Sequence, residues 1–580
     1  MDQRLRRLIV PGWAAALALA VCAPLFRHGY VLSYDMVWVP HLDLDRPEIW
    51  GLGSALPRAV PSDAVAALLG AMIPAALVQR VVLFGALFLL AVGTARLLRQ
   101  RPLVAQLAGA TFAVWNPFVA ERLVLGQWPL LLGLAAFPWL IFALADRDGP
   151  HWWLAVVALA GTALSPATGL MGVLLGGAAA WRRGVVRVVF LAALLNAPWI
   201  IGGLQHASEA KSDPRAVALF GLQSEGHFGR LGSALTLGGI WNTEVVPTSR
   251  TLVIAVLIGV VIAVVMLIGL AVLWHEDRRL LAVSGFAGAC GLTVALAGWL
   301  APDQVARVVE NVSGGGVIRD GTRWLALLVP LEAVAFAAGI GSLLDRNGYR
   351  DRIVPAWVAP MAVVCMLLPI IALPDLAWGA AGNLKPTSYP SSWGDAREVI
   401  SASRTPGDIL VLPFTAYRRP AWNHDTSVLD PAGRYFDRVT VTNDALDVSG
   451  HPIAGEDPRA ARIGHVLSAR GVDSHGVRRR LARDGIGIVV LETDAPGAQR
   501  ALSRIKGAHE LTIKGSGLRV FALPGASDTS IDSHNRRTLT VTWTIAGFTL
   551  LMGLIGGVRS GLRRLDRKSS KHPTRQVPKA

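Results

Sequence analysis

Charged residues are scarce in this 580-residue chain. They make up 17% of it, against 52% hydrophobic residues, whereas soluble domains carry about a quarter charged residues. This composition excludes a soluble globular protein. Long apolar runs also exclude disorder over most of the length, because they can bury enough surface to offset the entropy of ordering. We therefore expect a polytopic α-helical membrane protein.

Cysteine is scarce as well, with three in the chain, Cys22, Cys290 and Cys365. Each falls in a different apolar segment without a CxxC partner, so we interpret them as small buried hydrophobic residues and expect no disulfide framework. The sequence has no Walker loop, no dinucleotide-binding fingerprint, no GxSxG and no HExxH motif. No pair of histidines has metal-ligand spacing, so no residue is assigned to a metal site.

Basic residues outnumber acidic ones by 56 to 40, which gives a formal net charge of +16. In a soluble protein this excess would suggest nucleic acid. Here the arginines gather in short clusters between apolar runs, as they do in the cytoplasmic loops of membrane proteins. We therefore expect membrane lipids and no nucleic acid as partners, and the alternation of the clusters places both termini in the cytoplasm.

A membrane-spanning helix needs about 20 apolar residues. The apolar runs predict twelve spans, at residues 8–26, 80–97, 102–118, 129–145, 152–166, 167–181, 185–204, 251–274, 280–300, 324–344, 354–373 and 538–558. The apolar stretch 64–78 is short and contains Pro74, so we interpret it as an interfacial or re-entrant helix. The first run lacks a clear cleavage site and is expected to be a retained helix rather than a secretory signal.

Hydropathy falls between residues 375 and 537, and the predicted topology places this stretch outside the cytoplasm. Short apolar strands are predicted at 408–414 and 485–491, amphipathic helices at 457–470, 474–483 and 497–506, and a hairpin around Gly515-Ser-Gly517. The expected organisation is a transmembrane module over 1–374, an extracytoplasmic α/β domain over 375–537, a final transmembrane helix over 538–558 and a basic cytoplasmic tail over 559–580.

The first outer loop carries a run of acids. Asp35 follows the first span closely, where partial desolvation raises the pKa of a carboxylate, so it suits a general base. His41 lies in the same loop, and Asp43 and Asp45 are two residues apart, a spacing that can grip a divalent cation, which is therefore a candidate cofactor. The alternative is that these are ordinary solvated loop acids.

The segment between the third and fourth spans brings an acid, a base and an amide to the outer interface. These are Glu121, Arg122 and Gln127, followed by Trp128. They are candidates for substrate binding, because polar groups at membrane depth are costly to bury. The alternatives are a surface ion pair and a tryptophan of the interfacial aromatic belt.

The loop before the tenth span reads Ser313-Gly-Gly-Gly-Val-Ile-Arg319-Asp320-Gly-Thr-Arg323. Backbone N–H groups, a helix N-terminus and two guanidinium groups all favour bound oxyanions, so Arg319, Asp320 and Arg323 are candidates for a phosphate site. The alternative is a contact with lipid headgroups. The polar, aromatic stretches Tyr417–Asp425 and Arg434–Tyr435 suit sugar contacts or form an ordinary surface loop.

Several of these features occur together in a known family. They are an aspartate soon after the first span, a short interfacial helix, a second span that opens with Gln79-Arg80, the block Asn116-Pro-Phe…Glu121-Arg-Leu…Gly126-Gln-Trp128, and an outer C-terminal domain. With them the sequence resembles the GT-C superfamily of polyprenyl-phosphate-sugar glycosyltransferases. Over roughly residues 1–345 it is similar to the membrane module of the actinobacterial arabinofuranosyltransferases that build cell-wall arabinan.

The resemblance implies a multi-pass enzyme of the cytoplasmic membrane that transfers a sugar from a polyprenyl-phosphate donor to an envelope glycan or glycolipid, with inversion. Asp35 would deprotonate the acceptor hydroxyl, while Arg319 and Arg323 would bind the phosphate of the donor. Envelope-assembly proteins are candidate partners. Many relatives have paired acids close together, whereas Asp43 and Asp45 stand eight and ten residues from Asp35.

Two other classes stay open. One is a non-catalytic scaffold that uses a glycosyltransferase-derived body to bind envelope glycan or partner enzymes. Convergence of Asp35, Arg319 and Arg323 on one outer cavity favours the enzyme, whereas a solvated Asp35 favours the scaffold. The other is a lipid or glycan transporter, although the inverted repeats and broken midplane helices typical of transporters are not evident.

Overall fold

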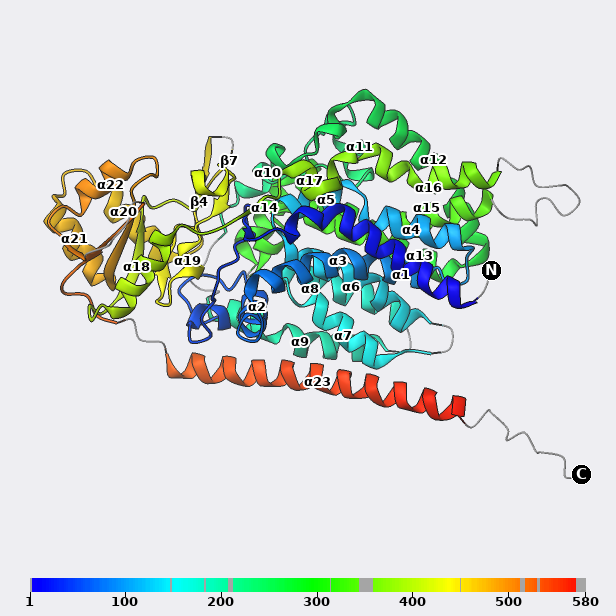
Figure 1. The fold of residues 1–580 in the computed structure, drawn as a ribbon, viewed down its shortest axis with the longest axis horizontal. Coiled ribbons are helices and arrows are strands. Elements are labelled where there is room, and N and C mark those ends of the chain that lie inside the picture. Colours follow the sequence, from blue (N-terminus) through cyan, green and yellow to red (C-terminus); the bar gives the residue numbers. More distant parts are fainter. Residues whose placement is uncertain are drawn as a thin grey trace, which may run out of the picture.

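A helical bundle with a sheet-containing domain at one end forms the protein in the computed structural model (Figure 1). The structure describes residues 3–146, 149–181, 184–206, 212–312, 314–343, 358–448, 450–511, 517–528 and 532–569. Ser313, Gly515, Ser516, the ends of two predicted spans (344 and 354–357) and tail residues 570–580 lie outside these ranges. The first helix begins, and the last helix ends, at the end of the bundle opposite the sheet (Figure 1).

Among the described residues, eight helices are long and apolar enough to cross a membrane. They are α1 (Gln3–Cys22), α3 (Ala75–Leu97), the pair α4 (Leu103–Val114) and α5 (Pro117–Val124), α6 (Trp128–Ala145), α9 (Val185–Gln205), α12 (Val253–Glu276), α13 (Arg278–Leu300) and α23 (Ser533–Ser569). Two bent pairs raise the number to ten if each is one span. They are η7 (Gly321–Leu327) with α15 (Val329–Leu343), and α16 (Val358–Ala372) with α17 (Ala377–Gly382).

The predicted count of twelve spans is therefore not confirmed. Residues 152–181 form two short apolar helices, α7 (Trp152–Thr162, 11 residues) and α8 (Pro166–Ala180, 15 residues). Proline is favoured at the first turn of a helix, because the backbone N–H that it lacks would have no partner within the helix there. Pro166 therefore starts α8 and divides the stretch into two helices. The predicted interfacial segment forms α2 (Ser62–Gly70), and Pro74 separates it from α3. Figure 1 places α2 at the end of the bundle nearest the sheet.

Small residues let helices of the bundle approach closely. A Cβ on Gly269 of α12 would overlap the carbonyl of Ala335 in α15, and one on Gly339 would overlap that of Val265. Glycine at such crossings is typical of helix pairs that pack within membranes. The outer faces of α12 and α23 expose large apolar side chains such as Leu257, Leu267, Phe548 and Leu551, as expected of surfaces that face lipid.

The C-terminal α/β domain (residues 391–523) is built on a five-stranded mixed sheet in the order β10-β11-β9-β3-β6. The strands are β3 (Asp408–Leu412), β6 (Thr440–Val441), β9 (Ile486–Glu492), β10 (His509–Leu511) and β11 (Leu518–Ala522). Helices α18 (Ser391–Ala402), α20 (Pro458–Ser468), α21 (Ser474–Arg483) and α22 (Ala498–Arg504) pack with it. The predicted strands at 408–414 and 485–491 and the three amphipathic helices of this region are thus confirmed. Strands β10 and β11 pair antiparallel, whereas residues 512–516, which include most of the predicted first hairpin strand, lie outside the described residues.

Short elements lie between the bundle and this sheet, and those within residues 391–523 belong to the α/β domain. They are β1 (Tyr30–Val31), η2 (Pro47–Trp50), α10 (Ala216–Leu219), α11 (Gly229–Leu235), α14 (Pro302–Asn311), η6 (Gly315–Ile318), β2 (Pro386–Thr387), β4 (Tyr417–Arg418), β5 (Val428–Leu429), α19 (Ala432–Tyr435), β7 (Leu446–Val448) and β8 (His451–Ile453). Three pairs of them form two-stranded antiparallel sheets, β1 with β2, β4 with β5 and β7 with β8. The candidate site lies among these connections.

Candidate functional site

The first loop (residues 27–61) runs between the bundle and the α/β domain and carries Asp35. Tyr30 and Val31 pair with Thr387 and Pro386 as an antiparallel ladder. Further on, the side-chain amide of Asn423 donates to the carbonyl of Leu32 at 3.1 Å. The loop is therefore fixed by segments that lie more than 350 residues away in the sequence.

The turn between α5 and α6 supports the other side of this loop. The amide of Asp35 donates to the carbonyl of Leu125 at 3.1 Å, and the hydroxyl of Ser33 donates to that of Val124 at 2.6 Å. Gly126 has φ of +80°, and a Cβ there would overlap the amide of Met36. Glycine is required at this position both for its left-handed backbone and for the close approach of the loop.

Both carboxylate oxygens of Asp35 accept hydrogen bonds. Tyr417, in β4 of the α/β domain, donates to Oδ1 at 2.5 Å. Gln127, from the α5–α6 turn, donates to Oδ2 through Nε2 at 3.3 Å. Burial raises the pKa of the Tyr417 phenol well above its ordinary value, and the charge of Asp35 adds to the shift, so Tyr417 stays a donor at any physiological pH.

Asp35 lines a small cavity that is partly open to solvent. Its apolar wall includes the indoles of Trp38 and Trp128, whose ring centroids are 5.4 Å apart at 44°. The Nε1 atom of Trp38 is buried and has no hydrogen-bond partner among the described residues. The small residues Ala66, Gly70 and Ala75, from α2 and the start of α3, complete this wall.

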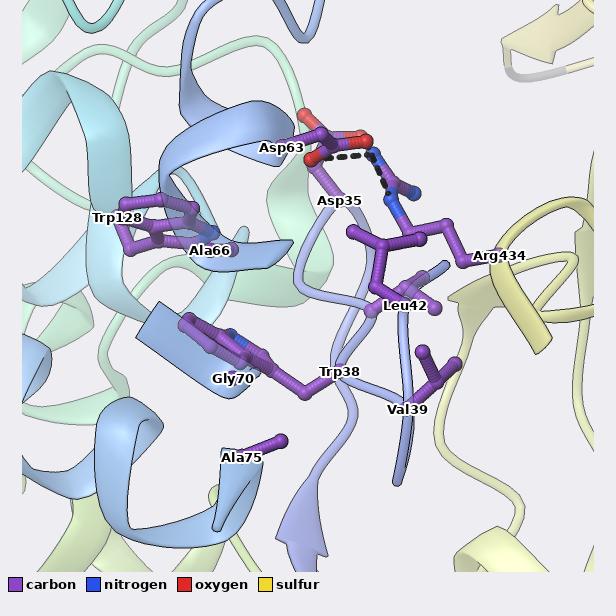
Figure 2. Close-up of a pocket in the computed structure, with 11 residues that line it drawn as sticks. Asp35, Trp38, Val39, Leu42, Asp63, Ala66, Gly70, Ala75, Trp128 and Arg434 are labelled. Atoms are coloured by element: carbon purple, nitrogen blue, oxygen red, sulfur yellow. Dashed lines mark hydrogen bonds and ion pairs between the residues drawn. The ribbon is translucent and has the colours of Figure 1, made fainter. Parts of the chain in front are cut away.

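An ion pair between two different parts of the chain closes the polar side of the cavity. Arg434, in α19, donates from Nε to Asp63 Oδ2 at 2.8 Å and from Nη2 to Oδ1 at 3.3 Å. Figure 2 shows Arg434 pointing toward Asp63 and Asp35. Burial opposes its charge, but Asp63 and, more weakly, Asp35 hold the pKa of Arg434 above its ordinary value. The cavity thus combines two carboxylates, one guanidinium and two indoles.

The predicted polar block 121–128 divides between the cavity and the protein interior. Trp128 lines the cavity and Gln127 holds Asp35. Arg122 is buried and donates to Gln127, Asp320 and Thr322 at 3.1, 3.2 and 2.5 Å. Glu121 is also buried and lies beside Glu225, which pairs with Arg250 at 2.9 Å. A surface ion pair between Glu121 and Arg122 is therefore wrong, because the two side chains join separate buried networks.

The two arginines predicted to bind phosphate do not line the cavity. Arg319 donates to Glu456 of the α/β domain at 2.6 Å, and Glu456 also binds Arg58 and Ser212. Burial opposes ionisation of Glu456, but Arg58 and Arg319 outweigh it and hold its pKa at about 2. Burial, with repulsion from Arg58, lowers the pKa of Arg319 to about 10.

Arg323 lies closer to the catalytic candidate. Its Nε atom is 3.0 Å from Asp320 Oδ2, and 36% of its side chain is exposed. Asp320 is buried, yet Arg122 and Arg323 lower its pKa. Arg323 and Arg58 also act on the phenol of Tyr417, where both oppose the rise of its pKa. Positive charge is therefore present on the Tyr417 side of Asp35 as well as at Arg434.

The remaining acids of the first loop lie outside the cavity lining. His41 and Asp45 are exposed, and Asp43 is half-buried and accepts from the Asp45 amide at 3.0 Å. The two aspartates thus form a local turn. Within the described part of the chain, no three His, Cys, Asp or Glu side chains are grouped to hold a metal ion.

Sequence reasoning missed Asp63 and did not connect Tyr417 or Arg434 with Asp35. Asp63 directly precedes the predicted interfacial helix, and an acid next to an apolar run could have marked it as a candidate site residue. Tyr417 follows β3 by five residues, at the carboxyl end of parallel strands, where ligand sites gather in α/β sheets. No sequence pattern near Tyr417 shows that the carboxyl end of these strands faces the loop that carries Asp35.

No protein-family model matches the chain, and no characterised protein matches it by sequence. Among solved structures, the chain is similar to the arabinofuranosyltransferase AftD from mycobacteria, with a TM-score of 0.57 at 15% sequence identity. The match covers 91% of this chain and 42% of that one, so this chain spans less than half the length of its neighbour. The similarity shows that this chain shares its fold with part of that protein.

Proposed function

We propose that this protein is a membrane glycosyltransferase that transfers a sugar from a polyprenyl-phosphate donor to an envelope glycan or glycolipid, at the outer face of the cytoplasmic membrane. A shared fold does not fix an activity, so the proposal depends on the site. The observation that carries it is the position of Asp35, which is held by two hydrogen bonds at the edge of a cavity with an aromatic wall and a half-buried arginine.

The arrangement supports an inverting transfer with Asp35 as the base. The acceptor hydroxyl oxygen forms a bond to the anomeric carbon of the donor, and the bond from that carbon to the phosphate oxygen breaks. The acceptor proton passes to Asp35, and polyprenyl phosphate leaves with the electron pair. A general base must lie within hydrogen-bond reach of the proton it takes, and Asp35 at the cavity lining meets this requirement for an acceptor bound there.

The other lining groups suit the rest of the substrate. Indole faces of Trp38 and Trp128 can stack on a sugar ring. Arg434 supplies a guanidinium for the phosphate. Arg434 suits this role better than Arg319, because the guanidinium of Arg319 is engaged by Glu456.

The alternative is a scaffold that binds glycan without transferring it, and catalysis separates the two. The test uses the full chain in lipid nanodiscs, farnesyl-phosphoryl arabinofuranose as the donor and an arabinan oligosaccharide as the acceptor. We expect transfer by the wild type and a loss of at least about 100-fold in Asp35→Asn, which keeps the shape but not the basicity of the side chain. Asp303→Asn, an exposed change in α14, should transfer normally. Oligosaccharide binding without transfer, or normal transfer by Asp35→Asn, would reject the proposal.

A further inference from the structure

The carboxylate of Asp35 is held by a side chain 382 positions further along the chain. Tyr417 donates to it at 2.5 Å, whereas Gln127 donates at 3.3 Å. Short hydrogen bonds to an ionised acceptor are the stronger ones. The stronger of the two contacts that orient this carboxylate therefore comes from the α/β domain and not from the helical bundle.

The hairpin that carries Tyr417 also binds the backbone next to Asp35. Tyr34 donates its N–H to the carbonyl of Ser427 at 2.7 Å and accepts from the amide of Leu429 at 2.9 Å. These two bonds hold Tyr34 beside Val428 of β5 as a parallel bridge. Tyr34 has φ of +44°, a left-handed conformation that a bulky residue keeps only where its surroundings fix it. The hairpin thus sets the backbone from which Asp35 projects.

The hairpin is itself anchored to the sheet through the residue after Tyr417. Arg418 is buried and binds Asp430 at 2.8 Å and Glu492, the last residue of β9, at 3.1 Å. It also donates to the carbonyl of Pro413 at 2.9 Å. A guanidinium with three such partners has little conformational freedom. The backbone at Tyr417, the preceding residue, is therefore held in a fixed position relative to the sheet.

We infer that Tyr417 is a positioning residue for the catalytic base, and that the β4–β5 hairpin makes the α/β domain an integral part of the catalytic centre. This inference rests on the proposed function, because it takes Asp35 as the base. Tyr417 orients the carboxylate toward the cavity and stabilises its ionised form with a donated hydrogen bond. The charged groups that act on the Tyr417 phenol are Asp35, Arg323 and Arg58.

The test compares Tyr417→Phe with the wild type in the transfer assay. Loss of one charge-assisted hydrogen bond should lower kcat by about 10- to 100-fold, with the KM for donor little changed. Tyr389→Phe is the matched control, since its hydroxyl donates to the backbone of Trp38 in the same loop at 3.0 Å and not to Asp35. This control should keep kcat close to the wild-type value.

A second measurement does not depend on turnover. Hydrogen–deuterium exchange of residues 33–36 in the intact protein should speed up by about tenfold in Tyr417→Phe, since these amides lie in the loop that the tyrosine secures. An unchanged kcat in Tyr417→Phe, or unchanged exchange in this segment, overturns the inference. If Asp35→Asn is active or the wild type is inactive, the proposed function fails, and the exchange result still decides whether Tyr417 holds the loop.

Discussion

Arg434 and Asp63 form a bidentate ion pair, in which Nε and Nη2 of the arginine lie 2.8 and 3.3 Å from Oδ2 and Oδ1 of the carboxylate. The arginine belongs to α19 of the α/β domain and the aspartate to the first turn of α2. The pair occupies one edge of the guanidinium and leaves the N–H groups of the other edge to a phosphate. It stands at the cavity beside the proposed base.

Arg434→Lys should therefore impair donor use more than turnover. Lysine keeps the charge but cannot offer two parallel N–H donors to a phosphate, so we expect the KM for the farnesyl-phosphoryl donor to rise about tenfold, with kcat changed much less. Steady-state kinetics at saturating acceptor measure both constants. Arg397→Lys is the matched control, because Arg397 forms a similar pair with Asp437 away from the cavity. An unchanged KM in Arg434→Lys would remove this arginine from the phosphate site.

Gly126→Ala should displace the first loop. The added Cβ would overlap the amide of Met36 and the carbonyl of Ser33, and alanine is strained at φ of +80°. A shift of about 1 Å at a catalytic group can reduce the rate about 100-fold, and we expect a loss of that order while the protein still inserts. Gly394→Ala in α18, where a Cβ meets nothing within 4 Å, serves as the control in the same assay. Full activity in Gly126→Ala would show that the turn does not set the position of Asp35.

Glu492 should make stability depend on pH. Burial raises its pKa to about 8, although Arg418 opposes the shift, while Asp430 and Asp494 add to it. In the unfolded chain Glu492 releases its proton near the ordinary pKa of 4.5, whereas in the folded protein it holds the proton up to about pH 8. The protonated side chain therefore contributes its full stabilisation below about pH 4.5, and this contribution is lost as the pH rises toward 8. The wild type should therefore unfold at a lower temperature at pH 8.5 than at pH 6.

Glu492→Gln should flatten this dependence, because glutamine keeps an acceptor for Arg418 without a charge. We expect its Tm at pH 8.5 to exceed that of the wild type by about 3 °C, measured by tryptophan fluorescence in detergent. Glu398→Gln, an exposed change in α18, controls for the loss of one carboxylate. If the variant and the wild type lose stability in parallel between pH 6 and 8.5, Glu492 is not the group responsible.

The membrane character and the elements of the α/β domain could be predicted from the sequence because both depend on local patterns. Apolar runs of about 20 residues indicate spanning helices, and short continuous apolar runs bounded by Gly and Pro indicate β3 and β9. The count of twelve spans was less secure, since the short helices α7 and α8 differ from full spans only by a few residues on each side of Pro166.

The site was predictable only in part. Asp35 and Trp128 stood out because polar groups at membrane depth are costly to bury and because Trp128 belongs to the polar block 121–128. Their partners did not, because Tyr417 and Arg434 reach the cavity through contacts between segments almost 400 residues apart. The predicted phosphate role of Arg319 depended on nearby glycines, whereas its actual partner, Glu456, is 137 residues away.

The pairing of β1 with β2 has a consequence for biosynthesis. The ribosome completes Tyr30 and Val31 long before it reaches Pro386 and Thr387, so β1 has no partner strand until the second segment has been made. Until then the loop that carries Asp35 lacks one of the contacts that fix it. A translation stop before residue 386 should therefore yield a fragment in which this loop is not held in place.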